Sequence, residues 1–163
     1  MGRYSFQLRN FWCSIAVLLF FVGPGSHAQT RQEHIHHKGH SVMPFDLEKT
    51  VHIFRMTESG GVQRVIVKND VEKDQVAAIQ MHLKHEADLF QRGNYADPAS
   101  LHGEDMPGLS DLQKGAKQVR VSYASLPNGA QVTFETSDLR LLTAIHRWFG
   151  AQLSEHGADA RAE

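Results

Sequence analysis

The alternation of apolar and polar residues predicts two β-hairpins along the chain. Residues 50–57 and 62–68 are rich in β-branched and aromatic side chains and flank the letters ESGG, which favour a tight glycine turn. Residues 118–124 and 130–136 form a second pair around the letters PNG, and Asn-Gly tolerates the positive φ of a hairpin turn. Apolar residues alternate in this pair, so we expect one of its faces to be buried.

Apolar residues at helical spacing predict a helix after each hairpin. The first helix should run from 69 or 70 to about 91, and the second from 137 or 138 to 157. Between them, residues 93–117 form a long loop with one helical turn over 109–114. The two apolar stripes consist of Val76, Ile79, Leu83, Ala87 and Phe90 in the first helix and Leu141, Leu142, Ile145, Trp148, Phe149 and Leu153 in the second.

The order hairpin, helix, hairpin, helix predicts an α+β domain over residues 50–157. Its halves look like a diverged repeat of one ββα unit, with turn glycines at matching places. The two units would form a four-stranded antiparallel sheet with both helices on one face, because that arrangement buries both apolar stripes. We expect residues 29–49 to be a flexible, His-rich arm and residues 158–163 to be a disordered tail.

Residues 1–28 have the three parts of a secretory signal peptide. Arg3 and Arg9 form a basic start, an apolar run covers 11–22, and small residues place a cleavage site after Ala28. An apolar run of about a dozen residues is too short to span a bilayer comfortably, which disfavours the alternative of a membrane anchor. The sequence therefore predicts a periplasmic protein without stable membrane insertion once the signal is cleaved.

Composition excludes several function classes. Cys13, the only cysteine, lies within the signal, so the mature chain can form neither disulfides nor thiolate metal sites. The chain has 17 basic and 18 acidic residues, and removal of the two signal arginines leaves a net charge of −3. A slightly acidic domain offers no electrostatic reason to bind nucleic acid.

Histidine is the unusual component of the chain. There are 11 histidines, and only His27 belongs to the signal. Imidazole suits copper, zinc and nickel, and a thioether adds a preference for Cu(I). Short His-rich tracts are typical of metal-binding segments. The arm therefore predicts a metal site, with copper first and zinc or nickel second, whose ligands are His34, His36, His37, His40 and Met43.

The central loop supplies a second candidate pair, His102 and Met106, four residues apart. Both could reach one soft ion, although a methionine more often fills a gap in a core. His82, His85 and Glu86 are interpreted as exposed polar residues of the first helix. Their spacing differs from the His-Glu-x-x-His spacing of zinc proteases.

No catalytic motif is present: the chain lacks Gly-x-Ser-x-Gly, a P-loop and Gly-x-Gly-x-x-Gly. The sequence thus leans away from an enzyme, although a haem or acid–base site built on His82, His85 or His146 is an open alternative. Another is a non-catalytic envelope module. His52, Phe54 and Met56 point to one side of their strand. That face could bind a second copy or another envelope protein, be covered by the arm, or bind a ligand. His52 and Met56 would also be a further copper-type pair.

Two stretches resemble a family of small, poorly characterised exported proteobacterial proteins, over most of residues 43–159. They are LHGxxMPGL, residues 101–109, and LLTAIHRWFGAQL, residues 141–153. Members are sometimes labelled aspartate carbamoyltransferase, but this chain is about half the length of that enzyme and lacks its Ser-x-Arg-Thr motif. The resemblance also implies an association with metal resistance. Together with the histidines it favours a periplasmic metal-binding protein.

Overall fold

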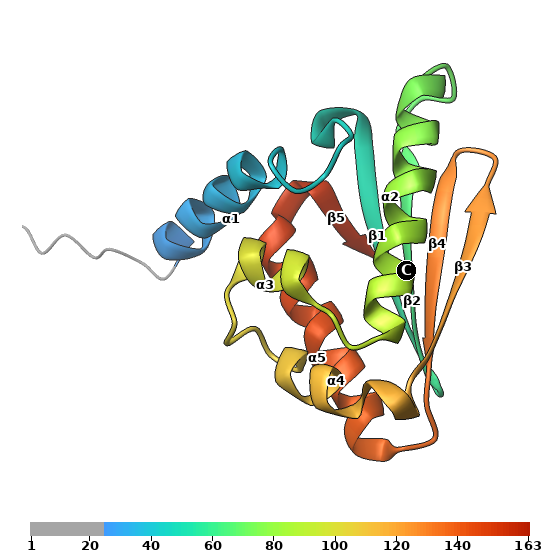
Figure 1. Cartoon of the computed structure of the whole chain (residues 1–163). Helices are drawn as coiled ribbons and strands as arrows, with labels where there is room; N and C mark the ends of the chain where they lie inside the picture. Colours follow the sequence, from blue (N-terminus) through green and yellow to red (C-terminus); the bar gives the residue numbers. More distant parts are fainter. Residues whose placement is uncertain (1–24) are drawn as a thin grey trace, which may run out of the picture.

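The fold is a single β-sheet with helices packed on one of its faces (Figure 1). The structure, a computed structural model, describes residues 25–163. Residues 1–24 of the predicted signal peptide, which covers residues 1–28, lie outside the described residues. The mixed α+β class is confirmed. Among the described residues, no helix is both long enough and apolar enough to cross a membrane.

The described residues form five strands in the order β3-β4-β2-β1-β5. The two predicted hairpins are present, with all of their pairs antiparallel. Their central contact joins β2 to β4, so the second hairpin extends the first. The strands are β1 (Thr50–Thr57), β2 (Gly60–Val67), β3 (Arg120–Leu126), β4 (Gly129–Glu135) and β5 (Ala160–Ala162).

The prediction of a four-stranded, purely antiparallel sheet is wrong in one respect, because β5 adds a parallel edge strand beside β1. The tail predicted to be disordered therefore supplies part of the sheet. Its backbone pairs with β1, which would otherwise leave a row of unpaired donors and acceptors at the sheet edge. The side chain of Glu163 also forms an ion pair with Arg64 and lies 3.8 Å from Arg55.

Both predicted helices are confirmed: α2 (Lys73–Gln91) and α5 (Leu139–His156). The Asp138 side chain caps α5 by accepting hydrogen bonds from the backbone of Arg140 and Leu141. The start of α2 comes later than predicted, because Asn69 forms a turn before the helix. The predicted loop contains α4 (Leu109–Gly115), which was expected, and α3 (Ala96–His102), which was not.

The segment predicted to be a flexible arm is instead folded. Residues Gly25–Gly39 form α1, which projects from the body in Figure 1 and packs against α5 and α3. Ile35 is buried, and after the helix Met43, Phe45 and Leu47 enter the core. These apolar positions, interspersed among the polar ones, give the segment enough buried surface to order it.

The helices cover the face of β1 that carries His52 and Phe54. In the antiparallel register His52 lies opposite Val65 and Phe54 opposite Gln63, so these four side chains share a face. Phe54 is only 1% exposed and contacts Phe149 of α5. His52 and Phe54 are therefore not available to a partner, and Val51 and Ile53 lie on the opposite side of β1.

Candidate functional site

A cavity of about 60 Å³ lies between the sheet, α2 and α5. Helix α3 and residues 42–43 close its sides. Such a volume has room for several water-sized molecules. Most of the lining side chains are buried, while Val42, His82 and Asp97 are partly exposed and mark its mouth.

Two helical rows line the cavity, and both run from a histidine to an aromatic ring. His82, Glu86 and Phe90 lie four residues apart on α2, and Trp148, Gln152 and His156 lie four apart on α5. Residues at this spacing share one side of a helix. Phe90 contacts Trp148 at the aromatic end, with ring centroids 5.6 Å apart. The other end, where the histidines gather, is called the histidine end here.

Three imidazoles meet at the histidine end, each from a different element. His52 of β1 stacks on His156 of α5 with ring centroids 5.0 Å apart, and His102 of α3 meets His156 edge-on at 4.9 Å. All three residues are buried. The fold thus brings together residues that are 50 or more positions apart in the sequence.

The N–H groups of these rings are directed at fixed acceptors. His102 Nδ1 lies 2.7 Å from Glu155 Oε2, and Glu155 also forms a 2.8 Å ion pair with Arg31 of α1. His156 Nε2 lies 3.0 Å from Gln152 Oε1. A neutral imidazole has one donor and one acceptor nitrogen. Since an amide oxygen can only accept, neutral His156 donates from Nε2 and its Nδ1 carries a lone pair, whereas His102 also interacts with Gln152 through a hydrogen bond.

His52 follows the same rule. The backbone of Asp159 raises the pKa of its ring, and its Nδ1 is buried without a hydrogen-bond partner in residues 25–163. In the neutral tautomer with the proton on Nε2, Nδ1 carries the lone pair. His52 and His156 thus each have one ring nitrogen without a hydrogen-bond partner in the described part of the chain.

Burial keeps these imidazoles neutral. Loss of hydration lowers the pKa of His52 from 6.5 to about 4, against the opposing charge of Asp159. Burial also lowers the pKa of His156 well below its usual value, and the neighbouring His52 and His102 lower it further. For His102 burial again lowers the pKa, although the Glu155 carboxylate opposes it. At neutral pH the lone pairs are therefore not blocked by protons.

An acidic pair occupies the α2 side of the cavity. Glu86 is 5% exposed, and burial raises its pKa to about 8, with the negative charge of Asp97 and a hydrogen bond to that residue adding to the effect. A bond that raises a carboxyl pKa is one that the protonated form donates. Burial beside Asp97 thus favours the neutral, protonated form of Glu86 near pH 7.

Five buried polar atoms on lining residues have no hydrogen-bond partner within the described part of the chain; they are called the open polar atoms here. Leaving a buried donor or acceptor unpaired costs about 1–3 kcal/mol each, so a native cavity that concentrates them is expected to hold a polar guest. The open polar atoms are His52 Nδ1, Gln63 Oε1, Glu86 Oε1, Trp148 Nε1 and His156 Nδ1.

The sequence-predicted ligands separate into two groups in the structure. Met43 and His102 line the cavity and are buried. His34, His37 and His40 are exposed on or just after α1, and His36 is partly exposed and pairs with Asp159 at 2.6 Å. The rings of His36 and His40 are in contact, with centroids 5.4 Å apart.

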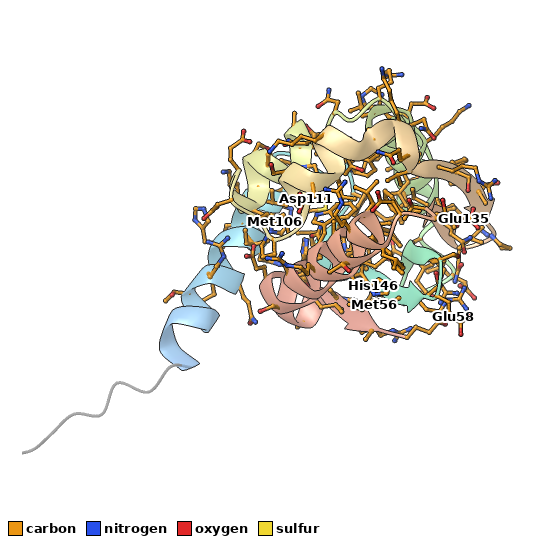
Figure 2. All side chains as sticks on the ribbon, turned by 90° about the horizontal axis from the view of Figure 1, so that it is seen from below. Met56, Glu58, Met106, Asp111, Glu135 and His146 are labelled. Atoms are coloured by element: carbon orange, nitrogen blue, oxygen red, sulfur yellow. The ribbon has the colours of Figure 1, made fainter. Side chains whose placement is uncertain are left out.

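The predicted His102–Met106 pair does not meet in this cavity. Met106 is buried in the core but is not among the lining residues. Figure 2 shows it near Asp111, beside α3 and α4. The His52–Met56 pair is also separated, because Met56 is 45% exposed and lies beside His146 of α5 in Figure 2.

Sequence reasoning paired His52 with Met56 instead of with this cavity, and it missed the other residues that complete the cavity: His156, Glu86, Gln63 and Gln152. Glu86 was interpreted as an exposed polar residue, but it is seven residues after Ile79 and four before Phe90, within the apolar stripe. His156 likewise follows Trp148 by eight residues on the buried side of α5. A polar residue at a core position of a helix was the signal that could have identified both.

Within residues 25–163, no group of three or more histidine, cysteine or acidic side chains is arranged so that it could hold a metal ion. The near-parallel stacking of His52 on His156, at 17°, explains this, since the in-plane lone pairs of stacked rings do not converge on one point. Comparison of the chain with protein-family models, curated proteins and solved structures gives no match.

Proposed function

We propose that this protein binds a copper ion at the histidine end of its cavity and acts as a metal-handling protein of the bacterial periplasm. The observation that carries the proposal is the pair of open polar atoms His52 Nδ1 and His156 Nδ1, lone-pair nitrogens on touching, buried rings. Neutral imidazole nitrogen is a good copper ligand. A buried site binds an ion only where donors of this kind replace the water that the ion loses.

The donor set favours Cu(I) over harder ions. Met43 adds a thioether to the imidazole-lined cavity, and thioethers select Cu(I). Cu(I) also accepts two ligands in a linear arrangement, so it needs no group of three. Binding of both Nδ1 atoms to one ion requires one ring to turn out of the stacked arrangement. Nothing in this donor set favours Mg²⁺ or Ca²⁺, which require several oxygen ligands.

The surroundings of His102 support a ligand role for that ring too. Metal-binding histidines usually donate their second N–H to a carboxylate or carbonyl, which fixes the tautomer and the ring orientation. Glu155 supplies this contact to His102, and Arg31 holds Glu155 in place. Arg31 also donates to the His102 carbonyl oxygen at 2.7 Å. Two neighbours thereby fix the residue from outside the cavity.

Competition titration of the mature protein, residues 29–163, against a Cu(I) chelator tests the proposal. The wild type should bind one Cu(I), and replacing both cavity nitrogens, in His52→Phe with His156→Leu, should weaken binding on the order of 100-fold or more. His85→Ala, an exposed histidine of α2, is the matched control and should leave the affinity unchanged.

A third variant separates the cavity from the surface histidines. Replacing His34, His37 and His40 by alanine removes exposed imidazoles that are not among the cavity's lining residues. If the cavity is the site, this variant keeps full Cu(I) affinity. If it loses the ion while the cavity double variant retains it, the cavity proposal is rejected and the predicted α1 ligands are the better explanation. Elemental analysis of untagged protein from the periplasm reports which metal the cell supplies.

A further inference from the structure

Strand β3 is a long, unprotected edge of the sheet (Figure 1). The opposite edge, β5, has only three residues, whereas β3 has seven and has a neighbouring strand only on its β4 side. Proteins usually protect a free edge with bulges, prolines or lysines. The pairing of β3 with β4 is continuous from Arg120 to Leu126, and within this strand Arg120 is the single charged residue and no proline occurs. The edge is therefore open to another strand.

The register of the hairpin identifies the backbone groups that this edge presents. Leu126 lies opposite Gly129 across the two-residue turn, and the residues that flank such a turn exchange hydrogen bonds. Every second residue back along β3 therefore bonds to β4, and the residues between them direct their N–H and C=O groups outward. These outward residues are Val121, Tyr123 and Ser125. Of their six groups, only the Val121 N–H has an acceptor within residues 25–163, the Gln91 side chain at 2.8 Å.

The sequence of β3 is complementary to itself when two copies run antiparallel. A two-fold axis at Tyr123 places this residue opposite its own counterpart and places Val121 opposite Ser125 of the second copy, so outward groups meet outward groups along the whole edge. Arg120 then lies opposite Leu126, and the two arginines are at opposite ends of the pair. A parallel arrangement would place the arginines side by side, where like charges are unfavourable.

The side chains of β3 fit the same register on both faces of the sheet. Tyr123 packs against the core on the face that the helices cover, and the axis brings its ring opposite the ring of the second copy. Aromatic pairs of this kind stabilise antiparallel strands. On the other face Ser122 lies opposite Ala124, and both are small and exposed. No bulky or charged side chain thus opposes the pairing.

Helix α2 adds complementary charges beside this edge. Gln80 bonds to one end of β3 and Gln91 to the other, so one side of α2 runs along the strand. Lys84 and Asp88 are exposed between the two glutamines, and the spacing of four residues keeps them on that side. The two-fold axis makes α2 antiparallel to its counterpart. Lys84 of each copy is therefore directed toward Asp88 of the other.

We propose that β3 pairs antiparallel with β3 of a second copy of this chain, so that the two sheets join into one across a two-fold axis at Tyr123. The proposal is independent of the copper site, because no residue of β3 lines the cavity. One strand and one helix side from each copy form a small interface, and small interfaces are typical of weak, reversible association. The dimer therefore forms at high protein concentration and dissociates on dilution.

Sedimentation equilibrium of the metal-free mature protein, up to about 500 µM, tests the proposal. The wild type should approach twice the monomer mass. Ser125→Pro removes an outward N–H and leaves the bonds to β4 in place, so it should raise the dissociation constant on the order of 10-fold or more. Leu139→Pro is the matched control, because Leu139 is exposed at the first position of α5, where proline is tolerated. This variant should associate like the wild type.

Cysteine cross-linking tests the register even if Ser125→Pro fails to fold. Cys13 is the only cysteine of the chain, so residues 29–163 contribute no native thiol. An equimolar mixture of Ser122→Cys and Ala124→Cys should form an intermolecular disulfide on mild oxidation, because these positions would lie opposite each other with Cα atoms about 4.5 Å apart. Either variant alone should cross-link several-fold less, because its two cysteines would be diagonal neighbours about 7–8 Å apart.

Each outcome decides for or against pairing through β3. A wild type that stays monomeric over the whole concentration range overturns the proposal. A dimer that Ser125→Pro leaves unchanged, or whose mixed and single cysteine variants cross-link equally, also overturns it, because another surface then joins the two copies. A dimer that is weakened by Ser125→Pro but not by Leu139→Pro, and that cross-links chiefly in the mixture, supports it.

Discussion

Replacing Glu86 by glutamine should stabilise the protein, because the carboxyl group is costly to ionise inside the cavity. Burial raises the pKa of Glu86 from 4.5 to about 8, with Asp97 adding to the effect. Between these pH values the folded protein holds a proton that the unfolded chain releases. The free energy of unfolding therefore falls as the pH rises from 4.5 to 8 and is constant above that window. Glutamine is neutral at every pH and has nearly the size of the carboxylic acid.

The size of the effect follows from the change in pKa. At 1.36 kcal/mol per pH unit, a change from 4.5 to about 8 corresponds to about 5 kcal/mol at pH values above 8. Local rearrangement and water entry reduce such costs, so we expect Glu86→Gln to be more stable than wild type by about 2–5 kcal/mol at pH 8.5. Near pH 5 the two proteins should agree within about 1 kcal/mol.

Urea unfolding of the metal-free mature protein at pH 5, 6, 7 and 8.5 measures this difference directly. Comparing variant with wild type at each pH cancels the contribution of the histidines, which both proteins share. Glu104→Gln changes an exposed acid and should follow the wild-type curve. If wild type and Glu86→Gln lose stability in parallel from pH 5 to 8.5, Glu86 is ionised in the folded protein and the reasoning fails.

Two further predictions concern the metal-free protein. The pKa of His52 is lowered from 6.5 to about 4, so between these pH values only the unfolded chain protonates this histidine. The free energy of unfolding should therefore drop by about 3 kcal/mol as the pH falls from 6.5 to 4. Chemical denaturation of His52→Gln should show a smaller drop over the same pH range. Gly61→Ala should cost about 1–3 kcal/mol, because its Cβ would lie 2.4 Å from the Phe149 ring. At Gly150 an added Cβ would have its nearest neighbour 3.9 Å away, so Gly150→Ala should instead raise the free energy of unfolding by up to about 1 kcal/mol through helix propensity. Equal shifts of the unfolding temperature in the two glycine variants would contradict this difference.

Local chemistry accounts for the elements that the sequence predicted well. The Asn-Gly turn and the Gly-Gly turn fix two hairpins, and Asp138 and Gly157 bound α5. Each of these signals acts within a few residues of the backbone it shapes. The arm and the tail were predicted less well because their order depends on distant partners: Ile35 needs the core, and β5 needs the free edge of β1.

The same difference separates the parts of the candidate site. Histidine excess, the lack of cysteines after Cys13 and the presence of Met43 and His102 could be read from the chain alone. That His102 shares a cavity with Met43, while Met106 does not, depends on how α3 docks between α1, α2 and α5. No residue spacing along a chain specifies that docking.

What the sequence by itself determined is the donor chemistry: imidazoles and thioethers, with the hairpins and helices that carry them. Only the tertiary structure decided which imidazoles lose their water and thereby stay neutral. His52, His102 and His156 come from a strand and two helices far apart in the chain. They meet because α5 buries its apolar stripe against the sheet and α3 packs beside α1, which itself packs on α5. Desolvation is a property of the packed interior, so the pKa values and free lone pairs that define the cavity exist only after folding.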